Sequence, residues 1–309
     1  MMLDVQGIYK KYDSVNVVED LSFTLAAGDI CGFIGPNGSG KTTTMRICAT
    51  LLLPDLGDVL INGLSVLSYP REARRMIGFM PDAFPIEGNI LTKDMIEFFG
   101  RSHGLFGSTL QSRMDDVIAF TNLETLLDKE FAALSKGMKQ RAALATTLMH
   151  DPKLLILDEP AAGLDPRARI ELRQLIRLLA EQEKTVLISS HILAELSEIC
   201  NQVVVIEQGK LRGEGDIHSM QRSVHQSNAL QVRCLCDAEL VEAFLQQEEK
   251  VSNILIRKEE VYFDFDGDLE QQSSLIHRMC EQGLKPIRLR EQEADLEEIF
   301  MSLTEGKVQ

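Results

Sequence analysis

Short, continuous apolar runs are the strongest pattern in the first part of the chain. Cys31–Gly35, Leu154–Leu157 and Thr185–Ser189 each contain almost no polar side chain and each ends at a turn or at polar residues. Such runs are typical of parallel strands buried on both faces. Thr43–Leu53, which ends before Pro54, and a longer stretch at about 92–150 have helical composition. We therefore predict an α/β fold.

Beyond Gly215 the pattern changes to alternation of apolar and polar residues. Four runs predict strands: Ala229–Cys236, Ile254–Arg257, Glu260–Phe265 and Lys285–Arg290. Three stretches have helical periodicity: Asp237–Glu249, Leu269–Gln282 and Glu293–Leu303. This order predicts a small α+β domain of the β-α-β type. We place the domains at residues 1–215 and 216–309.

Composition narrows the functional classes. The chain has 309 residues with 44% apolar residues, enough for about two folded domains, and its net charge is −15. This acidity argues against a general nucleic-acid binder, which needs a basic surface. No apolar stretch is long enough to span a bilayer, and we expect no leader peptide, because Asp4 and Gln6 interrupt the first residues. We expect a reduced cytosolic protein without a metal bound by its six cysteines, which are Cys31, Cys48, Cys200, Cys234, Cys236 and Cys280.

A phosphate-binding motif follows the first apolar run. Residues Gly35–Thr42, Gly-Pro-Asn-Gly-Ser-Gly-Lys-Thr, fit G-x-x-x-x-G-K-[ST] at every fixed position. Glycines allow backbone N–H groups to surround phosphate oxygens, and the next helix directs its positive end at the same anion. Lys41 can reach the outer phosphates, and the Thr42 hydroxyl can bind Mg²⁺.

Two further strand ends carry ionisable residues. The run Leu154–Leu157 leads into Asp158 and Glu159, and Thr185–Ser189 leads to His191. Beside a P-loop, Asp158 is expected to hold Mg²⁺ and Glu159 to polarise the attacking water. His191 is a candidate sensor of the γ-phosphate, with a surface or helix-capping histidine as the alternative.

The segment Leu134–Arg141, Leu-Ser-Lys-Gly-Met-Lys-Gln-Arg, lies between these motifs. With it, residues of about 3–215 resemble the ATP-binding subunits of ABC transporters. Gly35–Thr42 matches the Walker A motif, Leu154–Glu159 the Walker B motif and Ala162–Asp165 the D-loop. The resemblance implies a P-loop NTPase core of the ABC-ATPase type, with a helical subdomain at about 92–150, and an ATPase activity that energises transport.

The resemblance also implies where ATP and Mg²⁺ bind. The nucleotide-binding residues are expected to be Tyr12, which would stack on adenine, and Gly35, Pro36, Asn37, Gly38, Ser39, Gly40, Lys41, Thr42 and Thr43. Thr42, Asp82 and Asp158 would hold the metal, and Lys41, Glu159 and His191 would be catalytic. In this family two copies face each other head to tail, so Ser135 and Gly137 would contact the γ-phosphate bound by the opposing subunit.

Partners and location follow from the same resemblance. One P-loop per chain implies a second copy or a related ATPase subunit, together with a separate transmembrane permease. The variant signature Ser-Lys-Gly-Met-Lys-Gln-Arg is similar to that of subunits paired with ABC-2-type exporters, as is the ending Ala294–Phe300. The protein would then be cytoplasmic and peripheral on the membrane. Candidates for the permease groove are Phe84, Ile86, Met95, Phe98 and Phe99, with core packing as the alternative.

Two motifs depart from the commonest family pattern. Lys136 and Met138 replace the usual signature residues, which we interpret as a subfamily marker. Asp82 follows Ile77–Pro81 where the family usually has the glutamine of the Q-loop. Its extra negative charge beside Asp158 and Glu159 would either tighten metal binding or slow nucleotide docking.

Two other functions stay open on the sequence. One is a soluble ABC-type ATPase acting on ribosomes or nucleic acid, although such relatives usually carry two P-loops or basic linkers. The other is a nucleotide switch that hydrolyses slowly because of Asp82. For the domain after Gly215, dimerisation or stabilisation is one role, and sensing a ligand or regulatory protein is another.

Overall fold

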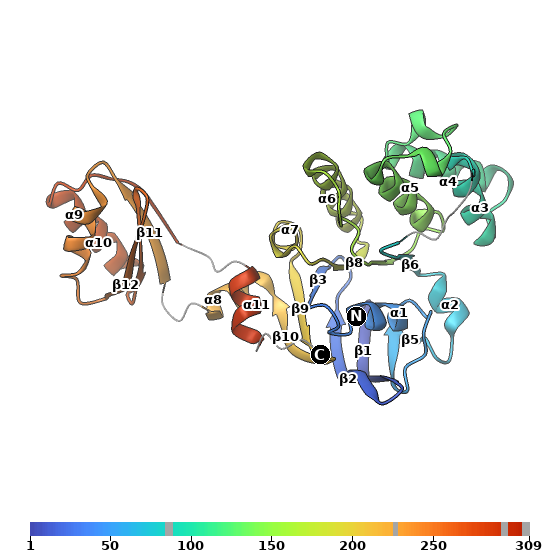
Figure 1. The fold of residues 1–309 in the computed structure, drawn as a ribbon, viewed down its shortest axis with the longest axis horizontal. Helices are drawn as coiled ribbons and strands as arrows, with labels where there is room; N and C mark the ends of the chain where they lie inside the picture. The colour runs from blue at the N-terminus through green and yellow to red at the C-terminus, as the bar shows by residue number, and fades with distance from the viewer. Residues whose placement is uncertain (84–88, 225–227, 292–295, 305–309) are drawn as a thin grey trace. The chain divides into compact units, whose positions relative to one another are not determined.

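The computed structural model describes residues 1–83, 89–224, 228–291 and 296–304. These form two compact units (Figure 1). The large unit comprises Met1–Ile217 and the described residues from Phe300 onward, and the small unit comprises His218–Ile299. The expected second domain, 216–309, therefore gives the end of its last helix, α11 (Leu296–Leu303), to the large unit. This association joins residues far apart in the chain, which composition does not reveal.

Two sheets build the large unit. The first is antiparallel, with the order β2 (Val15–Leu25), β1 (Leu3–Tyr12), β4 (Leu56–Ile61) and β5 (Leu64–Ser65). The second has the order β10 (Lys210–Asp216), β9 (Gln202–Glu207), β3 (Ile30–Ile34), β8 (Thr185–Ser189), β7 (Leu154–Leu157) and β6 (Ile77–Met80). From β9 to β6 its neighbouring strands are parallel, whereas β10 pairs antiparallel with β9. The predicted buried strands are thus confirmed.

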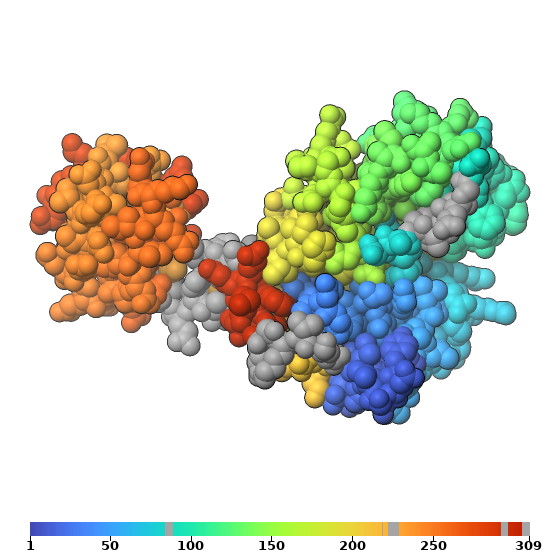
Figure 2. Space-filling view, viewed as in Figure 1, coloured from blue at the N-terminus to red at the C-terminus, as the bar shows by residue number. Residues whose placement is uncertain are grey.

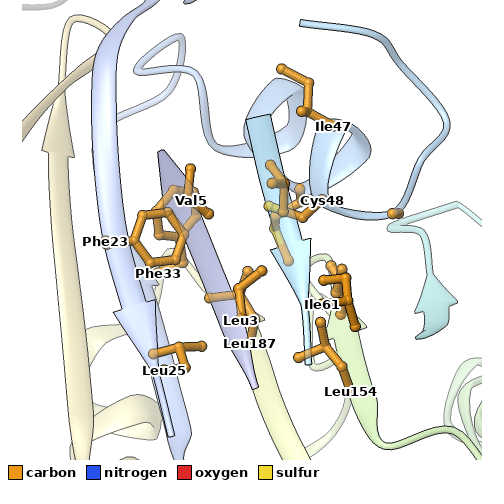
Figure 3. Close-up of a cluster of buried hydrophobic side chains, with 14 of the residues drawn as sticks. Leu3, Val5, Phe23, Leu25, Phe33, Ile47, Cys48, Ile61, Leu154 and Leu187 are labelled. Atoms are coloured by element: carbon orange, nitrogen blue, oxygen red, sulfur yellow. The ribbon is translucent and has the colours of Figure 1, made fainter. Parts of the chain in front are cut away.

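The core of the large unit lies between these two sheets (Figure 3). Phe23 of β2 and Phe33 of β3 lie with ring centroids 5.5 Å apart, so they join the antiparallel sheet to the parallel one. Leu154 and Leu187, from the parallel sheet, are fully buried in the same cluster. Burial of these apolar side chains fixes β3 in the sheet, directly before the P-loop.

Helix α1 (Lys41–Cys48) is shorter than predicted. The sequence suggested helix from Thr43 to Leu53, but Thr50 adopts a left-handed conformation with φ +62°. Its N–H donates to the Ile47 carbonyl, and the Leu51 N–H donates to the Arg46 carbonyl. These bonds satisfy the Ile47 and Arg46 carbonyls and end the helix with a threonine in the left-handed conformation that glycine more often adopts there.

The stretch at about 92–150 folds into helices, as predicted. It contains α3 (Thr92–Ser102), α4 (Gly107–Phe120), the 3₁₀ turns η1 (Glu124–Leu126) and η2 (Phe131–Ala133), and α5 (Lys136–Leu148). In Figure 2 these helices form a distinct green mass beside the blue antiparallel sheet of the same unit. The large unit also contains α2 (Pro70–Arg74), α6 (Pro166–Glu181) and α7 (Leu193–Ser197), whereas α8 (Ile217–Val224) starts at Ile217 and otherwise belongs to the small unit. Within the described residues, none of the helices has the length and apolar character needed to cross a membrane.

The small unit is an α+β domain of β-α-β type, as predicted. Its chain order is β11 (Asn228–Cys234), α9 (Ala238–Leu245), β12 (Val251–Arg257), β13 (Glu260–Phe265), α10 (Leu269–Glu281) and β14 (Pro286–Glu291). The strands form an antiparallel sheet in the order β12-β13-β11-β14. Leu230, Val232 and Phe263 from the sheet pack with Leu245 and Leu275 from the helices in a separate core.

Candidate functional site

Four neighbouring parallel strands direct their carboxyl ends to one edge of the sheet. In spatial order β3, β8, β7 and β6 lead into the P-loop, His191, the pair Asp158 and Glu159, and Asp82. Ligands in open α/β sheets bind at this edge. A cavity of about 310 Å³ lies there, lined by Val17, Asn37, Gly38, Gly40, Lys41, Thr42, Thr43, Asp82, Asp158 and Glu159. Residues predicted from separate motifs therefore meet in one hollow.

The P-loop has no room for side chains at two glycines. A Cβ at Gly35 would lie 2.4 Å from both the Ile206 carbonyl oxygen and the Ser39 Oγ. A Cβ at Gly40, where φ is +98°, would lie 2.5 Å from the Val17 carbonyl oxygen. Gly40 is also the N-cap of α1 and supplies no capping side chain. The free N–H groups of the first helical turn thus face the cavity, as binding of a phosphate requires.

Lys41 is folded back onto its own loop. Its Nζ donates to the carbonyl oxygens of Gly35, at 2.7 Å, and Pro36, at 3.1 Å. Burial lowers the pKa of Lys41 from its ordinary value, and the charges of Glu159 and Asp158 oppose that shift. The adjacent Thr42 is exposed to the cavity. A phosphate entering the loop would replace the two carbonyl contacts of Lys41 with a charged partner.

Ser189, at the end of β8, holds the two carboxylate residues of the neighbouring strand. Its Oγ donates to Asp158 Oδ1 at 2.7 Å and accepts from the Glu159 N–H at 2.9 Å. Asp158 is only 3% exposed. This role of Ser189 was not predicted from sequence, although a hydroxyl at the end of the next parallel strand was the available signal.

Glu159 and His191 lie in direct contact. His191 Nδ1 is 2.7 Å from Glu159 Oε2, and the His191 N–H donates to the same oxygen at 3.3 Å. Glu159 has φ +50°, a conformation that L side chains rarely adopt and that is typical of residues at functional sites. The His191 side chain is 57% exposed, so it has room to turn to another partner.

The residues at this edge offer the type of donor atom that Mg²⁺ prefers, but too few donors to hold the ion by themselves. Thr42, Asp82 and Asp158 offer hard oxygen donors, which Mg²⁺ prefers. No cluster of three or more His, Cys, Asp or Glu side chains close enough to hold a metal occurs in the described part of the chain. A magnesium ion here would need oxygens from a bound triphosphate, as is usual for this metal.

The signature residues Ser135 and Gly137 do not line the P-loop cavity. Ser135 is the N-cap of α5, and its Oγ accepts from the Met138 N–H at 3.4 Å. Both residues line a second cavity, of about 130 Å³, together with Leu164 and Asp165. Asp165, at the end of the D-loop, caps α6 through a bond from the Ala168 N–H at 2.9 Å. Within one chain, the signature and the P-loop thus line separate cavities.

Val17 of the antiparallel sheet lines the nucleotide cavity, whereas Tyr12 of the same sheet does not. Tyr12, predicted to stack on adenine, is 45% exposed at the end of β1 and is not among the cavity-lining residues described above. The Lys10 ammonium lies 6.0 Å from the centroid of its ring. Val17 of β2 does line the cavity and also blocks a side chain at Gly40. Its apolar, strand-like context gave no sign of this contact.

A larger apolar groove, of about 970 Å³, lies beside the nucleotide cavity in the same unit. It is lined by Arg46, Leu51, Phe79, Pro81, Ala83, Ile90, Asp94, Met95, Phe98 and Phe99. Of the predicted partner residues, Met95 is buried, whereas Phe98 is 65% exposed. Phe84 and Ile86 lie outside the described residues. The predicted residues thus include Met95, which packs in the core, and Phe98, which is exposed.

Comparison with known proteins decides the family. The ABC transporter family matches residues 18–162. The Nod factor export ATP-binding protein I of Burkholderia lata is 32% identical over 310 residues, which cover 99% of this chain and 98% of that protein. This chain belongs to the ATP-binding proteins of ABC transporters. The predicted family is confirmed, and the protein is an ATP-binding, ATP-hydrolysing transporter subunit.

Solved structures agree with this family. An ATP-binding subunit of an ABC transporter superposes with a TM-score of 0.66 at 28% identity, covering 72% of this chain and 93% of that one. A dimeric ATP-binding cassette in a post-hydrolysis state, bound to ADP and Pi, superposes with a TM-score of 0.64 at 22% identity, covering 70% and 98%. The ABC ATPase fold of the large unit is thereby confirmed.

Proposed function

We propose that this ABC ATPase subunit energises an exporter and works as a head-to-tail dimer with two ATP molecules at the interface. The similarity to the Nod factor export protein, which extends over nearly the whole of both chains, supports the assignment to export. The observation that carries the proposal is the cavity in which the P-loop, Asp82, Asp158 and Glu159 meet. It assembles one half of the reaction centre of such a dimer.

In this proposal the P-loop binds the phosphates of ATP. The N–H groups from Gly38 to Thr43 would donate to phosphate oxygens, and Lys41 would exchange its carbonyl contacts for the outer phosphates. Thr42 and Asp158 would hold Mg²⁺, with Asp82 at the rim of the same cavity. Mg²⁺, when bound, neutralises part of the phosphate charge. Tyr12 would cover the adenine end of the nucleotide.

Hydrolysis would depend on Glu159 and His191. Glu159 would accept a proton from the water whose oxygen bonds to the γ-phosphorus, while the bond from that phosphorus to the β,γ-bridging oxygen breaks. Ser189 holds the Glu159 backbone, and His191 holds its carboxylate. Since His191 is exposed, it can turn from Glu159 to the γ-phosphate and report its presence.

A second copy would complete each site. The chain has one P-loop, and its signature residues Ser135 and Gly137 line a cavity separate from the P-loop cavity. The free N–H groups at the start of α5 favour an anion. Facing copies would bring this helix end to the γ-phosphate held by the opposing P-loop. Binding of ATP would then close the dimer, and hydrolysis would open it.

The apolar groove is the proposed docking site of the transmembrane permease. Phe98, Phe99 and Met95 line it, and Phe79 and Pro81 extend it to the end of β6. A groove of this size on a large, acidic unit fits an amphipathic helix from a partner. Through that partner the subunit would lie on the cytoplasmic face of the membrane.

The test replaces the proposed water-activating residue. Glu159→Gln should lower ATP turnover at least about 100-fold while ATP binding persists, since the amide cannot accept the proton. With ATP, this variant should sediment as a dimer, and without ATP as a monomer. Glu183→Gln is the matched control, because Glu183 also has a positive φ in the large unit but lies outside the cavity. Rapid hydrolysis by Glu159→Gln would refute the assignment.

A further inference from the structure

The nucleotide cavity carries an excess of negative charge. Three carboxylates, those of Asp82, Asp158 and Glu159, line it with a single lysine, Lys41. Asp158 is fixed by a neutral hydroxyl, and Glu159 is held by His191. Asp82 is exposed, at the end of the strand next to the Walker B strand. A triphosphate must enter against this field, so a further cation would favour its binding.

An unpaired cation occurs at the first turn of α5. This turn contains Lys136 and Lys139 and no acidic residue, although positive charges are unfavourable at a helix N-terminus. The Lys139 ammonium lies 5.8 Å from the centroid of the Phe131 ring. Lys136 is exposed and forms no ion pair within the parts of the chain that the structure describes. Its position costs stability in the isolated chain.

Lys136 lies against the D-loop and one helical turn from Gln140. A Cβ at Gly163 of the D-loop, where φ is +65°, would lie 2.6 Å from Lys136 Nζ, so the lysine side chain lies over this glycine. Nearby, Gln140 is only 7% exposed and lines the cavity that Ser135 and Gly137 share. Its side-chain amide has no hydrogen bond to another described residue. Its amide is therefore open to this cavity, on the same helix as Lys136.

We propose that Lys136 is the cation that balances Asp82 across the dimer. This inference rests on the proposed head-to-tail arrangement. There, the α5 N-terminus of one copy faces the γ-phosphate in the cavity of the other, so the Lys136 ammonium of one copy approaches the phosphate and the Asp82 carboxylate of the other. The signature lysine of one copy and the Q-loop aspartate of the other then lie as opposite charges across the dimer interface.

The experiment is a double-mutant cycle on ATP-driven dimerisation in the Glu159→Gln background. Lys136→Met keeps the aliphatic chain over Gly163 and removes the charge, and Asp82→Asn removes the opposite charge. Sedimentation at saturating Mg-ATP should give a dimer Kd about tenfold higher for Lys136→Met. Lys136→Arg should restore it, and Lys136→Met combined with Asp82→Asn should lie within about twofold of the parent.

Three comparisons make the outcome decisive. Lys139→Met should show no coupling to Asp82→Asn, because the Lys139 ammonium lies at the Phe131 ring. An equal effect of Lys136→Met with and without Asp82→Asn would overturn the inference, as would no effect at all. If the Glu159→Gln protein forms no dimer with ATP, the proposed function itself fails, which is a different result from dimerisation without coupling.

Discussion

The large unit contains two hollows that differ in chemistry although the same elements line both. The nucleotide cavity, of about 310 Å³, is lined by charged groups and glycines at strand ends, and the groove, of about 970 Å³, by aromatic and aliphatic side chains. The start of α1 and Asp82 face the first, whereas Arg46 of α1 and Phe79 of β6 face the second. A movement of α1 or β6 must therefore alter both. This shared wall is a physical route from nucleotide to partner.

The largest expected effect is at the nucleotide cavity. Gly40→Ala should destabilise the large unit by about 3 kcal/mol or more and abolish ATP binding, because its Cβ would overlap the Val17 carbonyl oxygen at φ +98°. Urea unfolding and titration with a fluorescent ATP analogue measure the two effects.

Gly283→Ala in the small unit is the control for backbone strain. Gly283 also has a positive φ, +76°, but no atom lies within 4 Å of its added Cβ. It should lose about 1 kcal/mol and leave ATP binding unchanged. Equal losses in the two variants would mean that strain alone, rather than the contact with β2, sets the cost at Gly40.

The polar cavity was largely predictable from sequence, and the groove only in part, since the named Met95, Phe98 and Phe99 line it together with residues that sequence did not indicate. Walker motifs and strand ends placed Lys41, Thr42, Asp158 and Glu159 in one site, because parallel strands bring their carboxyl ends together. Ser189 and Val17 escaped notice, since their roles depend on which strands are neighbours. Phe98 and Met95 have the same helical spacing signal, yet one is exposed and the other buried. Only packing distinguishes them.

The second-largest expected effect is on how the free energy of unfolding depends on pH. It involves His150, which lies against the start of β6 and the end of α3. His150 Nε2 lies 2.8 Å from the Ile77 carbonyl oxygen, and its ring stacks on His103 at 3.8 Å. Burial, followed by the charge of His103, lowers the pKa of His150 from 6.5 to about 4, and the contact with Ile77 opposes this shift. As the pH falls, His150 therefore takes up its proton at a higher pH in the unfolded chain than in the native protein.

Between about pH 6.5 and pH 4 the native state should lose up to about 3 kcal/mol through His150, with no contribution above this window. His150→Gln should flatten the pH dependence of the large unit's unfolding free energy in that range. His277→Gln, at an exposed histidine 3.4 Å from Glu281 in the small unit, should not. Parallel pH profiles for His150→Gln and the parent would contradict the prediction.

The smallest expected effect concerns the groove. Phe98→Asp should reduce co-purification of a multi-span membrane protein about tenfold, because it places a charge on the proposed docking surface. Phe106→Asp is matched in exposure, 61% against 65%, but lies outside the groove. Both variants should unfold at the same temperature. Equal recovery of the membrane partner with both would remove Phe98 from the docking surface.

The path of the chain between the two units has a consequence for how the gene can be cut. The chain leaves the large unit after Ile217 and contributes to it again from Phe300, so the small unit is an insertion rather than a tail. A stop codon after Ile217 would delete part of the ATPase unit as well. Replacing the small unit by a shorter connection would change the loop-closure entropy only slightly, because this entropy varies slowly with loop length. An internal excision that rejoins these two points is therefore the way to remove the small unit alone.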